Sequence, residues 1–292
     1  MRRDAAAADS KGRRRVRLMP QAGFDAGAYW KNRLRDNFDL SGVGFLRRSE
    51  DYNRWVYRMR TEQLRGLIDR HAWPVKGRAV LDVGCGTGFF VDFWSSLEAA
   101  PLVGVDIAEV SIERLKPRFP DARFVCADIS GPQVEIDGTF DYVSVFDVLY
   151  HIVDDTRFEQ AAANLARLCR PGAKVLVTDM FGTRTTEVVR HVRNRSLEQY
   201  RTVFGRQGLK LTALRPLFFT LMPPTRLANR AAYWLGTLSW EALTCLARWS
   251  GPGRLWGGTL YRVDRTLQRW FDRGPSHHLA VFEFEGPAQN RT

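Results

Sequence analysis

A glycine-rich turn at residues 80–90 is the segment best suited to bind a small ligand. It reads VLDVGCGTGFF, a short apolar run followed by Gly84, Gly86 and Gly88. Glycine adopts backbone conformations closed to other residues, and a helix that begins after the turn points free N–H groups at a ligand. Dinucleotide-binding turns use the different spacing GxGxxG. The segment therefore predicts a nucleotide-type site of another kind.

Acidic residues follow the next two predicted strands. Asp106 ends the strand at 102–105, and a carboxylate at this position can accept both hydroxyl groups of a ribose. Asp128 ends the strand at 123–127 and is followed by Ile129, a pair that suits the amine and the ring face of an adenine. Because parallel strands place their carboxyl ends at one edge of the sheet, the acids and the glycine turn predict an adenosine-like ligand.

This ordered series of motifs resembles the class I S-adenosylmethionine-dependent methyltransferases, close to the small-molecule type 11/12 methyltransferase domains. The resemblance covers residues 77–178 and implies S-adenosyl-L-methionine as the cofactor. It implies that Asp82 and the glycine turn line the methionine moiety, while Asp106 holds the ribose. Asp128 with Ile129 would frame the adenine, and Phe146 would lie alongside the cofactor. The cofactor-binding residues so predicted are Asp82, Gly84, Cys85, Gly86, Gly88, Asp106, Ile107, Asp128, Ile129 and Phe146.

A histidine beyond the fourth predicted strand is the candidate catalytic residue. Methyl transfer is an in-line displacement, in which positioning supplies much of the rate. An oxygen or nitrogen acceptor also needs its proton removed, and His151 lies at the rim of the predicted site with an ordinary pKa suited to a base. Packing at the start of a helix explains this histidine equally well. Helix packing is also the expected role of the aromatic residues near the N-terminus. The alternative is that they contact the sulfonium of the cofactor through cation–π interactions. These residues are Tyr29, Trp30, Tyr52, Trp55 and Tyr57.

Two acids after the fourth and fifth strands raise the question of a metal site. Asp147 and Asp179 stand where the catechol-type methyltransferases keep metal-binding acids, but Met180 replaces the Asn of that group. Three oxygen ligands are wanted to hold Mg²⁺, so we predict solvated or capping acids and no metal. The basic strip at 191–195 is expected to be a solvated loop, with binding of an acidic acceptor as the alternative.

Alternating strands and helices must position these residues. After Pro74, short apolar runs alternate with amphipathic stretches, which is typical of a parallel sheet covered on both faces. The predicted fold class is α/β: a doubly wound, seven-stranded Rossmann-like methyltransferase sheet with an N-terminal helical cap and a helical insertion before the last strand. The strands are predicted at 79–83, 102–105, 123–127, 142–146, 174–178, 210–214 and 279–284.

Five segments are predicted along the chain. Residues 1–20 read as a basic, disordered tail, because seven Arg and Lys there face two Asp without any apolar periodicity. The tail also lacks the apolar stretch of a signal peptide, which predicts a cytoplasmic protein. The other segments are a helical cap at 21–74, a catalytic domain that binds S-adenosylmethionine at 75–215, an insertion or lid at 216–275, and the last strand with a C-terminal tail at 276–292.

The insertion has the spacing of two amphipathic helices joined at Gly251-Pro252-Gly253. It holds five of the nine tryptophans, and eight Arg face three acids. It can act as a lid over an apolar acceptor, rest on an anionic membrane surface, or pack as core. No transmembrane segment is predicted, because the apolar interval at 230–248 contains an acid and is shorter than the roughly 20 residues that a bilayer requires.

The charge of the chain keeps other functions open. A net charge of +12 favours anionic partners, so an RNA methyltransferase that uses the basic tail is one alternative. The chain lacks an Asn/Asp-Pro-Pro-aromatic run after the fourth strand, which argues against enzymes that grip a flipped base and makes a nucleic-acid partner the weaker prediction. A non-catalytic scaffold is a further alternative. The leading prediction is O- or N-methylation of a small-molecule acceptor, apolar or acidic, with a hydrophobic metabolite preferred.

Overall fold

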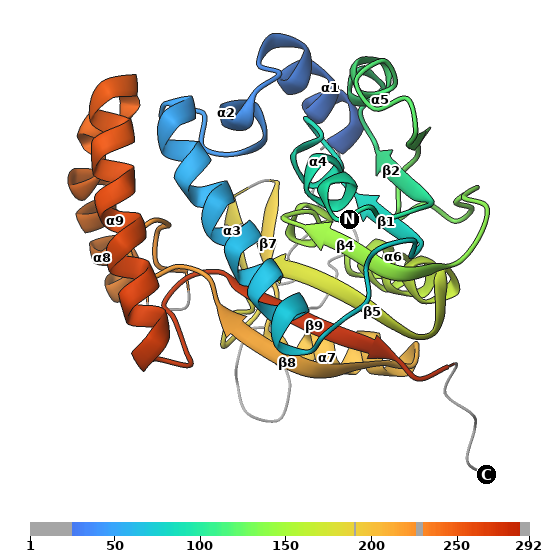
Figure 1. Ribbon diagram of the computed structural model, residues 1–292. Coiled ribbons are helices and arrows are strands. Elements are labelled where there is room, and N and C mark those ends of the chain that lie inside the picture. The colour runs from blue at the N-terminus through green and yellow to red at the C-terminus, as the bar shows by residue number, and fades with distance from the viewer. Residues whose placement is uncertain (1–24, 190, 226–229, 287–292) are drawn as a thin grey trace, which may run out of the picture.

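The computed structural model describes residues 25–189, 191–225 and 230–286, and a sheet of seven strands runs through them (Figure 1). The strand order is β3-β2-β1-β4-β5-β9-β8, in which the first five strands are parallel and β9 is antiparallel to both of its neighbours. The predicted doubly wound α/β sheet is thereby confirmed. The strands are β1 Val80–Val83, β2 Leu102–Asp106, β3 Arg123–Cys126, β4 Phe140–Phe146, β5 Cys169–Asp179, β8 Leu209–Pro216 and β9 His278–Phe284.

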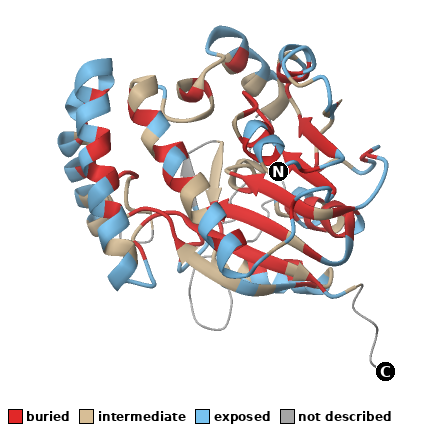
Figure 2. Cartoon of the chain, viewed as in Figure 1, coloured by how far each residue is buried: buried red, intermediate tan, exposed pale blue. Residues whose placement is uncertain are grey.

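Helices cover both faces of this sheet and create two separate cores. Alternate residues of a strand point to opposite faces, so Val80 joins the first core and Leu81 joins the second. Burial on both faces is why the strands read as apolar runs in the sequence (Figure 2). The first face carries α3 (Glu50–Arg70), α4 (Phe89–Ser96) and α5 (Glu109–Leu115), and the second carries α6 (Asp155–Arg167) and α7 (Leu197–Arg206).

The described part of the N-terminal segment is helical, as predicted. α1 (Ala26–Asp36) begins after Asp25, whose side chain accepts a hydrogen bond from the backbone N–H of Ala28. The short helix α2 (Leu40–Val43) connects it to α3. Residues 1–24 lie outside the described residues, so the tail predicted at 1–20 stays a prediction.

A two-stranded hairpin replaces the loop expected after β5. Its strands, β6 (Thr186–Val189) and β7 (Val192–Asn194), pair in antiparallel fashion. Arg195 is fully buried, and its Nη2 donates to Oδ1 of Asp155 at 3.0 Å. Nη2 of Arg193 donates to the same carboxylate group at 2.7 Å. The expectation of a solvated strip is therefore wrong, because these arginines neutralise an acid of α6.

The insertion forms two helices, of which α9 lies beside α3 (Figure 1). α8 (Arg230–Leu243) leads through a 3-10 turn, η2 (Cys245–Arg248), into α9 (Ser250–Trp270). Gly251-Pro252-Gly253 was expected to join the helices, but it forms the first turn of α9 instead. The fixed φ of proline and its missing N–H are compatible with the first helical positions, where no intrahelical donor is needed.

Candidate functional site

The glycine turn joins β1 to α4 and is bonded to the end of β2. Gly84 and Gly86 have φ values of +75° and +50°, which favour glycine. A Cβ atom at Gly84 would lie 2.2 Å from Cγ2 of Val148, so a larger residue does not fit without displacement. The N–H of Gly86 donates to Oδ2 of Asp106 at 2.8 Å. The turn and the predicted ribose-binding acid therefore form one unit.

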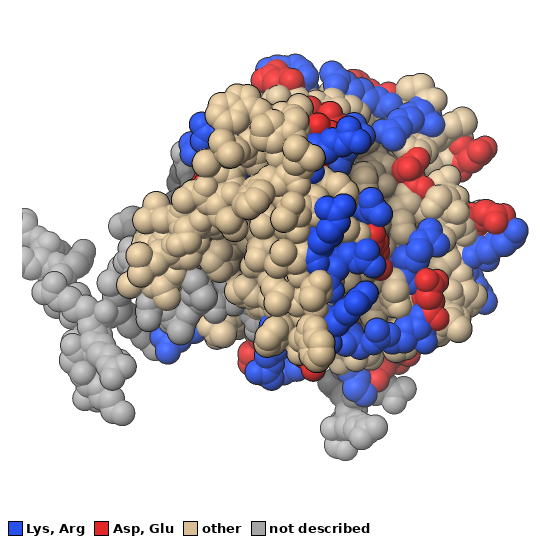
Figure 3. All heavy atoms as spheres, turned by 60° about the vertical axis from the view of Figure 1, so that its left-hand side comes forward, with Lys and Arg blue, Asp and Glu red and all other residues tan. Residues whose placement is uncertain are grey.

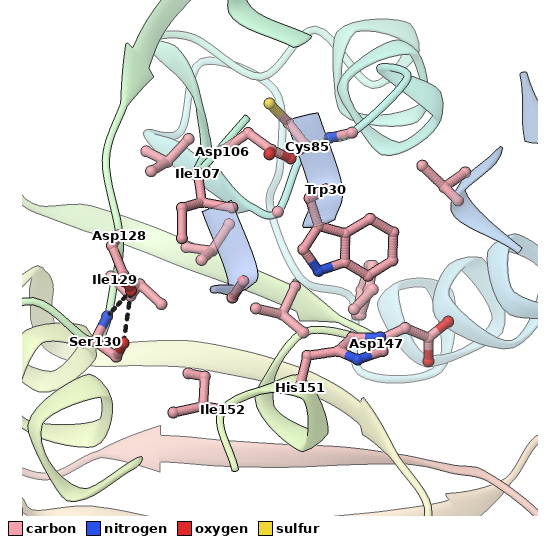
Figure 4. Close-up of a pocket in the computed structure, with 18 of the residues that line it drawn as sticks. Trp30, Cys85, Asp106, Ile107, Asp128, Ile129, Ser130, Asp147, His151 and Ile152 are labelled. Carbon is pink, nitrogen blue, oxygen red and sulfur yellow. Dashed lines mark hydrogen bonds between the residues drawn. The ribbon is translucent and has the colours of Figure 1, made fainter. Parts of the chain in front are cut away.

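Asp106 is held in place by its backbone neighbours at the pocket edge. Its Oδ1 accepts a second hydrogen bond, from the N–H of Ala108 at 2.8 Å. Burial raises the pKa of this carboxyl group, while the backbone N–H donors act in the opposite direction. Each oxygen has further acceptor capacity, so both can still receive a hydroxyl hydrogen. Figure 4 shows the carboxylate beside Cys85 and Ile107, as the sequence predicts.

Asp128 lies beyond the end of β3 and holds a local network. Its Oδ1 accepts hydrogen bonds from the N–H of Ser130 at 2.8 Å and from the hydroxyl of Ser130 at 2.6 Å (Figure 4). Its Oδ2 is bonded to the guanidinium of Arg157 from α6. Ile129 is buried beside it and lines the pocket. The predicted pair is in place, but Arg157 is a pocket residue for which the sequence carries no local signal.

The structure brings most of the predicted residues to one pocket and leaves Asp82 and Gly88 outside its lining. Asp82 is buried, and its Oδ1 accepts a hydrogen bond from the hydroxyl of Ser144 at 2.7 Å. Gly88 has a φ of +81°, and a Cβ there would lie 2.5 Å from Leu115, so its place in the fold is a packing position. The predicted residues that line the pocket are Gly84, Cys85, Gly86, Asp106, Ile107, Asp128, Ile129, Phe146 and His151.

The N-terminal helices close the pocket with an apolar wall. Tyr57 packs edge-on against Phe89, with ring centroids 4.9 Å apart, and Phe90 packs in the same way against Phe146 at 4.3 Å. Tyr52 and Trp55, also singled out in the sequence, contact α9 instead. None of the described residues of 216–275 lines the pocket, and a lid role for the insertion stays a prediction. The wall from the N-terminal segment consists of Ala26, Trp30, Leu34, Val43 and Tyr57.

His151 lies at the pocket rim in a defined tautomer. Its Nδ1 is 2.9 Å from the carbonyl oxygen of His191, and because a carbonyl can only accept, Nδ1 carries the proton. In the neutral ring, Nε2 is then the acceptor atom that a base requires. The ring of Trp30 packs edge-on against it, with centroids 4.9 Å apart (Figure 4). Burial lowers the pKa of His151 to about 4, so the ring is neutral at neutral pH.

Comparison with known proteins identifies the segment that supplies most of the pocket lining. Residues 80–172 match the family model described as a methyltransferase domain. These residues form a methyltransferase domain. The match begins at the first residue of β1 and includes the glycine turn, Asp106 and Asp128, so the resemblance drawn from the sequence is confirmed for this segment.

Individual relatives support the same domain. The chain is 34% identical over 115 residues to a ubiquinone biosynthesis O-methyltransferase of Paracidovorax citrulli. This alignment covers 38% of this chain and 46% of the relative. It is 35% identical over 131 residues to mRNA cap guanine-N(7) methyltransferase 1 of Oryza sativa, covering 38% and 35%. The chain thus spans less than half the length of either relative. The crystal structure of magnesium protoporphyrin IX methyltransferase from Synechocystis PCC 6803 shares the fold, with a TM-score of 0.52, 14% identity, and coverage of 70% of this chain and 95% of that one.

Two acids beside the pocket of the methyltransferase domain are engaged in internal bonds. Asp147 forms an ion pair with Arg60 of α3, whose side chain is 5% exposed. Asp179 is fully buried and accepts a hydrogen bond from the hydroxyl of Tyr200, and burial raises its pKa to about 7. Of the two roles expected for these acids, solvated or capping, the solvated one is therefore wrong. The described residues contain no group of three or more potential metal-binding His, Cys, Asp or Glu, and the absence of a metal stays a prediction.

Arg60→Leu should destabilise the protein by about 3–5 kcal/mol, because it leaves Asp147 charged in a largely buried site. The double variant Arg60→Leu with Asp147→Asn should recover part of that loss in stability, because neither partner of the buried ion pair then carries a charge. Arg54→Leu is the matched control on the same helix: its ion pair with Glu50 has an arginine side chain 64% exposed, and the expected loss is about 1 kcal/mol or less. Urea unfolding measures all three variants. Equal losses in Arg60→Leu and Arg54→Leu would contradict this interpretation.

Proposed function

We propose that the protein is an S-adenosylmethionine-dependent methyltransferase that methylates an oxygen or nitrogen of a small hydrophobic acceptor. The observation that carries the proposal is the bond between Gly86 and Asp106, which holds a carboxylate at the edge of the pocket beside the glycine turn. The match of residues 80–172 to a methyltransferase domain supports the same function. The structure of the Synechocystis relative, which was solved with the bound cofactor, has the same fold.

The residues present fit S-adenosylmethionine. Both oxygens of Asp106 can accept ribose hydroxyls, and Ile129 with Asp128 offers an apolar surface and an acceptor to the adenine. Behind the glycine turn, Oδ2 of Asp82 is buried and has no hydrogen-bond partner among the described residues. Burial raises the pKa of Asp82 to about 7, and the positively charged cofactor would favour its carboxylate form.

The acceptor side of the pocket favours an apolar molecule over an acidic one. Aromatic and aliphatic side chains of α1, α2, α3 and α4 form this wall, and the pocket's Arg157 is already bonded to Asp128. Arg193 and Arg195 are likewise bonded to Asp155. When bound, S-adenosylmethionine supplies a methyl group activated by its sulfonium. The apolar wall orients the acceptor and excludes water, and Nε2 of His151 is the atom proposed to take the acceptor's proton.

The proposed base predicts an unusual pH dependence. Since burial lowers the pKa of His151 from 6.5 to about 4, the ring keeps its neutral, proton-accepting form well into the acid range. With saturating S-adenosylmethionine, which would favour the carboxylate form of Asp82, and with an acceptor that does not itself titrate there, kcat/KM for the acceptor should stay unchanged as the pH falls through 6.5 and decline only as it approaches about 4. An acid limb centred on the ordinary histidine pKa would show that His151 is not the base in this form.

Transfer of a labelled methyl group tests the proposed function. The acceptors are hydrophobic phenols and amines, hydrophilic analogues of the same compounds, and capped RNA. Labelling of the hydrophobic set is the expected result. RNA is the second candidate, favoured by the similarity to the rice cap methyltransferase and by the net charge of +12. Labelling of RNA alone would replace the small-molecule proposal, and cofactor binding without transfer to any acceptor would favour the non-catalytic scaffold.

A further inference from the structure

The solvent-facing side of α8 is apolar, whereas an ordinary surface helix exposes polar residues on that side. Trp234, Leu235 and Leu238 each expose more than half of their surface, at 57%, 67% and 62%. The same spacing continues past the end of the helix to Trp249, which is 56% exposed. Isolated exposed apolar residues are normal, whereas a continuous row that includes tryptophans marks a site of interaction. This stripe of α8 therefore faces solvent, while other apolar residues of the insertion, namely Trp240, Leu260 and Tyr261, are buried in the core.

α9 extends this surface and borders it with positive charge. Leu255 and Trp270 are 76% and 79% exposed. Four arginines of α9 are exposed at helical spacing on one side. Figure 3 shows a broad surface without charges, flanked by a band of Lys and Arg. We call the first set the apolar face (Trp234, Leu235, Leu238, Trp249, Leu255 and Trp270) and the second the arginine row (Arg254, Arg262, Arg265 and Arg269).

Polar contacts on the opposite side of the two helices fix this orientation. Both oxygens of the buried Asp264 in α9 accept backbone N–H hydrogen bonds, at 3.0 Å from Phe219 and at 2.7 Å from Thr220. Trp240 of α8 donates from Nε1 to the carbonyl of Thr220 at 3.0 Å. α9 also approaches α3 closely at Gly257, where a Cβ would lie 2.7 Å from Trp55. The helices are thus anchored without using the apolar face.

The three acids of the insertion leave the arginine row with a net positive charge. Glu241 forms its ion pair with Arg48, at 2.6 Å, and Asp264 is buried. Asp272 is exposed beyond the end of α9, one acid against the four arginines of the row. Within the row, Arg265 reaches Glu62 at 3.5 Å, an exposed contact of the kind that contributes little. The surface therefore presents apolar side chains next to a net positive charge. A second copy of the chain would bring the same arginine row and the same net charge of +12, so self-association gains no charge complementarity.

We propose that the apolar face and the arginine row bind the surface of an anionic lipid membrane. Tryptophan and leucine on one side of a helix, with arginine beside them, are the composition of helices that lie in the headgroup region. The apolar side chains would enter the boundary with the acyl chains, and the arginines would bind lipid phosphates. None of the described helices is long and apolar enough to cross a membrane, so the contact is peripheral.

Sedimentation of the full chain with vesicles tests this proposal without cofactor or acceptor, and its outcome is independent of the proposed activity. Vesicles of phosphatidylcholine mixed with phosphatidylglycerol should bind the protein, and vesicles of phosphatidylcholine alone should bind it less. Combining Trp234→Ser, Leu238→Ser and Trp249→Ser should weaken binding by about tenfold or more. Tryptophan emission should shift to shorter wavelength on binding in the parent and less in this variant.

Matched variants separate the apolar and charged contributions. Leu238→Ser alone should bind more weakly than the parent. Arg254→Gln, Arg262→Gln and Arg269→Gln together should weaken binding more than Arg114→Gln, Arg201→Gln and Arg206→Gln, which remove the same charge from other exposed positions. Circular dichroism checks that each variant is folded. Binding that depends on total charge but not on the apolar face, no binding by the parent, or a parent dimer that the serine variants dissociate would each overturn the proposal.

Discussion

Asp106→Ala is expected to weaken the binding of S-adenosylmethionine by about tenfold or more, as measured by calorimetry. The carboxylate is the acceptor proposed for the ribose hydroxyls, and its loss leaves those hydroxyls unpaired in a site where the residue is only 7% exposed. It also removes the acceptor that holds the N–H of Gly86, so the glycine turn loses its fixed conformation. Asp106→Asn retains one acceptor oxygen and should have an intermediate affinity.

The control for this experiment is Asp121→Ala, at an exposed acid that precedes β3 and lies outside the pocket lining. It should bind the cofactor as the parent does. A thermal melt of each variant distinguishes the loss of a contact from the loss of the fold. If folded Asp106→Ala binds with the affinity of the parent, the ribose assignment is wrong. If the parent itself does not bind, the cofactor proposal fails.

His151→Ala is expected to lower kcat by about 100-fold while leaving the affinity for S-adenosylmethionine nearly unchanged, because general base catalysis contributes at least that factor. The hydrogen bond from Nδ1 to the carbonyl of His191 sets the tautomer in which Nε2 can accept a proton. The proposed cofactor contacts come from the ends of β1, β2 and β3, so they should survive the substitution. Steady-state kinetics with an acceptor from the labelling experiment, together with calorimetry, measure the two quantities.

A structural role for the same histidine gives a different result. Since the ring packs against Trp30, a purely structural His151 would show reduced stability and changed binding with little loss of kcat in the folded fraction. His151→Gln retains much of the side-chain volume but lacks a base, so it should be as slow as His151→Ala if the proposal is correct. His71→Ala, an exposed histidine at the end of α3, is the control for removing an imidazole.

The sequence predicted the ends of the strands and therefore the centre of the candidate site. The apolar runs mark where buried strands stop, and parallel strands end at one edge, so Asp106 and Asp128 could be placed near the glycine turn without coordinates. The sequence also indicated the local backbone conformation of the turn, because Gly84 and Gly86 have positive φ values that few residues other than glycine adopt. Asp82 lies behind the turn and outside the pocket lining, so its predicted contact with the methionine moiety stays a prediction.

The tertiary structure decided what depends on contacts between distant segments. The apolar wall of Trp30 and Tyr57 and the pairing of Arg157 with Asp128 join elements far apart in the chain, so no local spacing encodes them. The insertion shows this most clearly. Helical periodicity predicted an apolar stripe that includes Trp234, but periodicity does not tell whether the stripe faces the core or the solvent. Burial of Asp264 against backbone N–H groups turns the other side of the helix pair inward and leaves the stripe facing solvent.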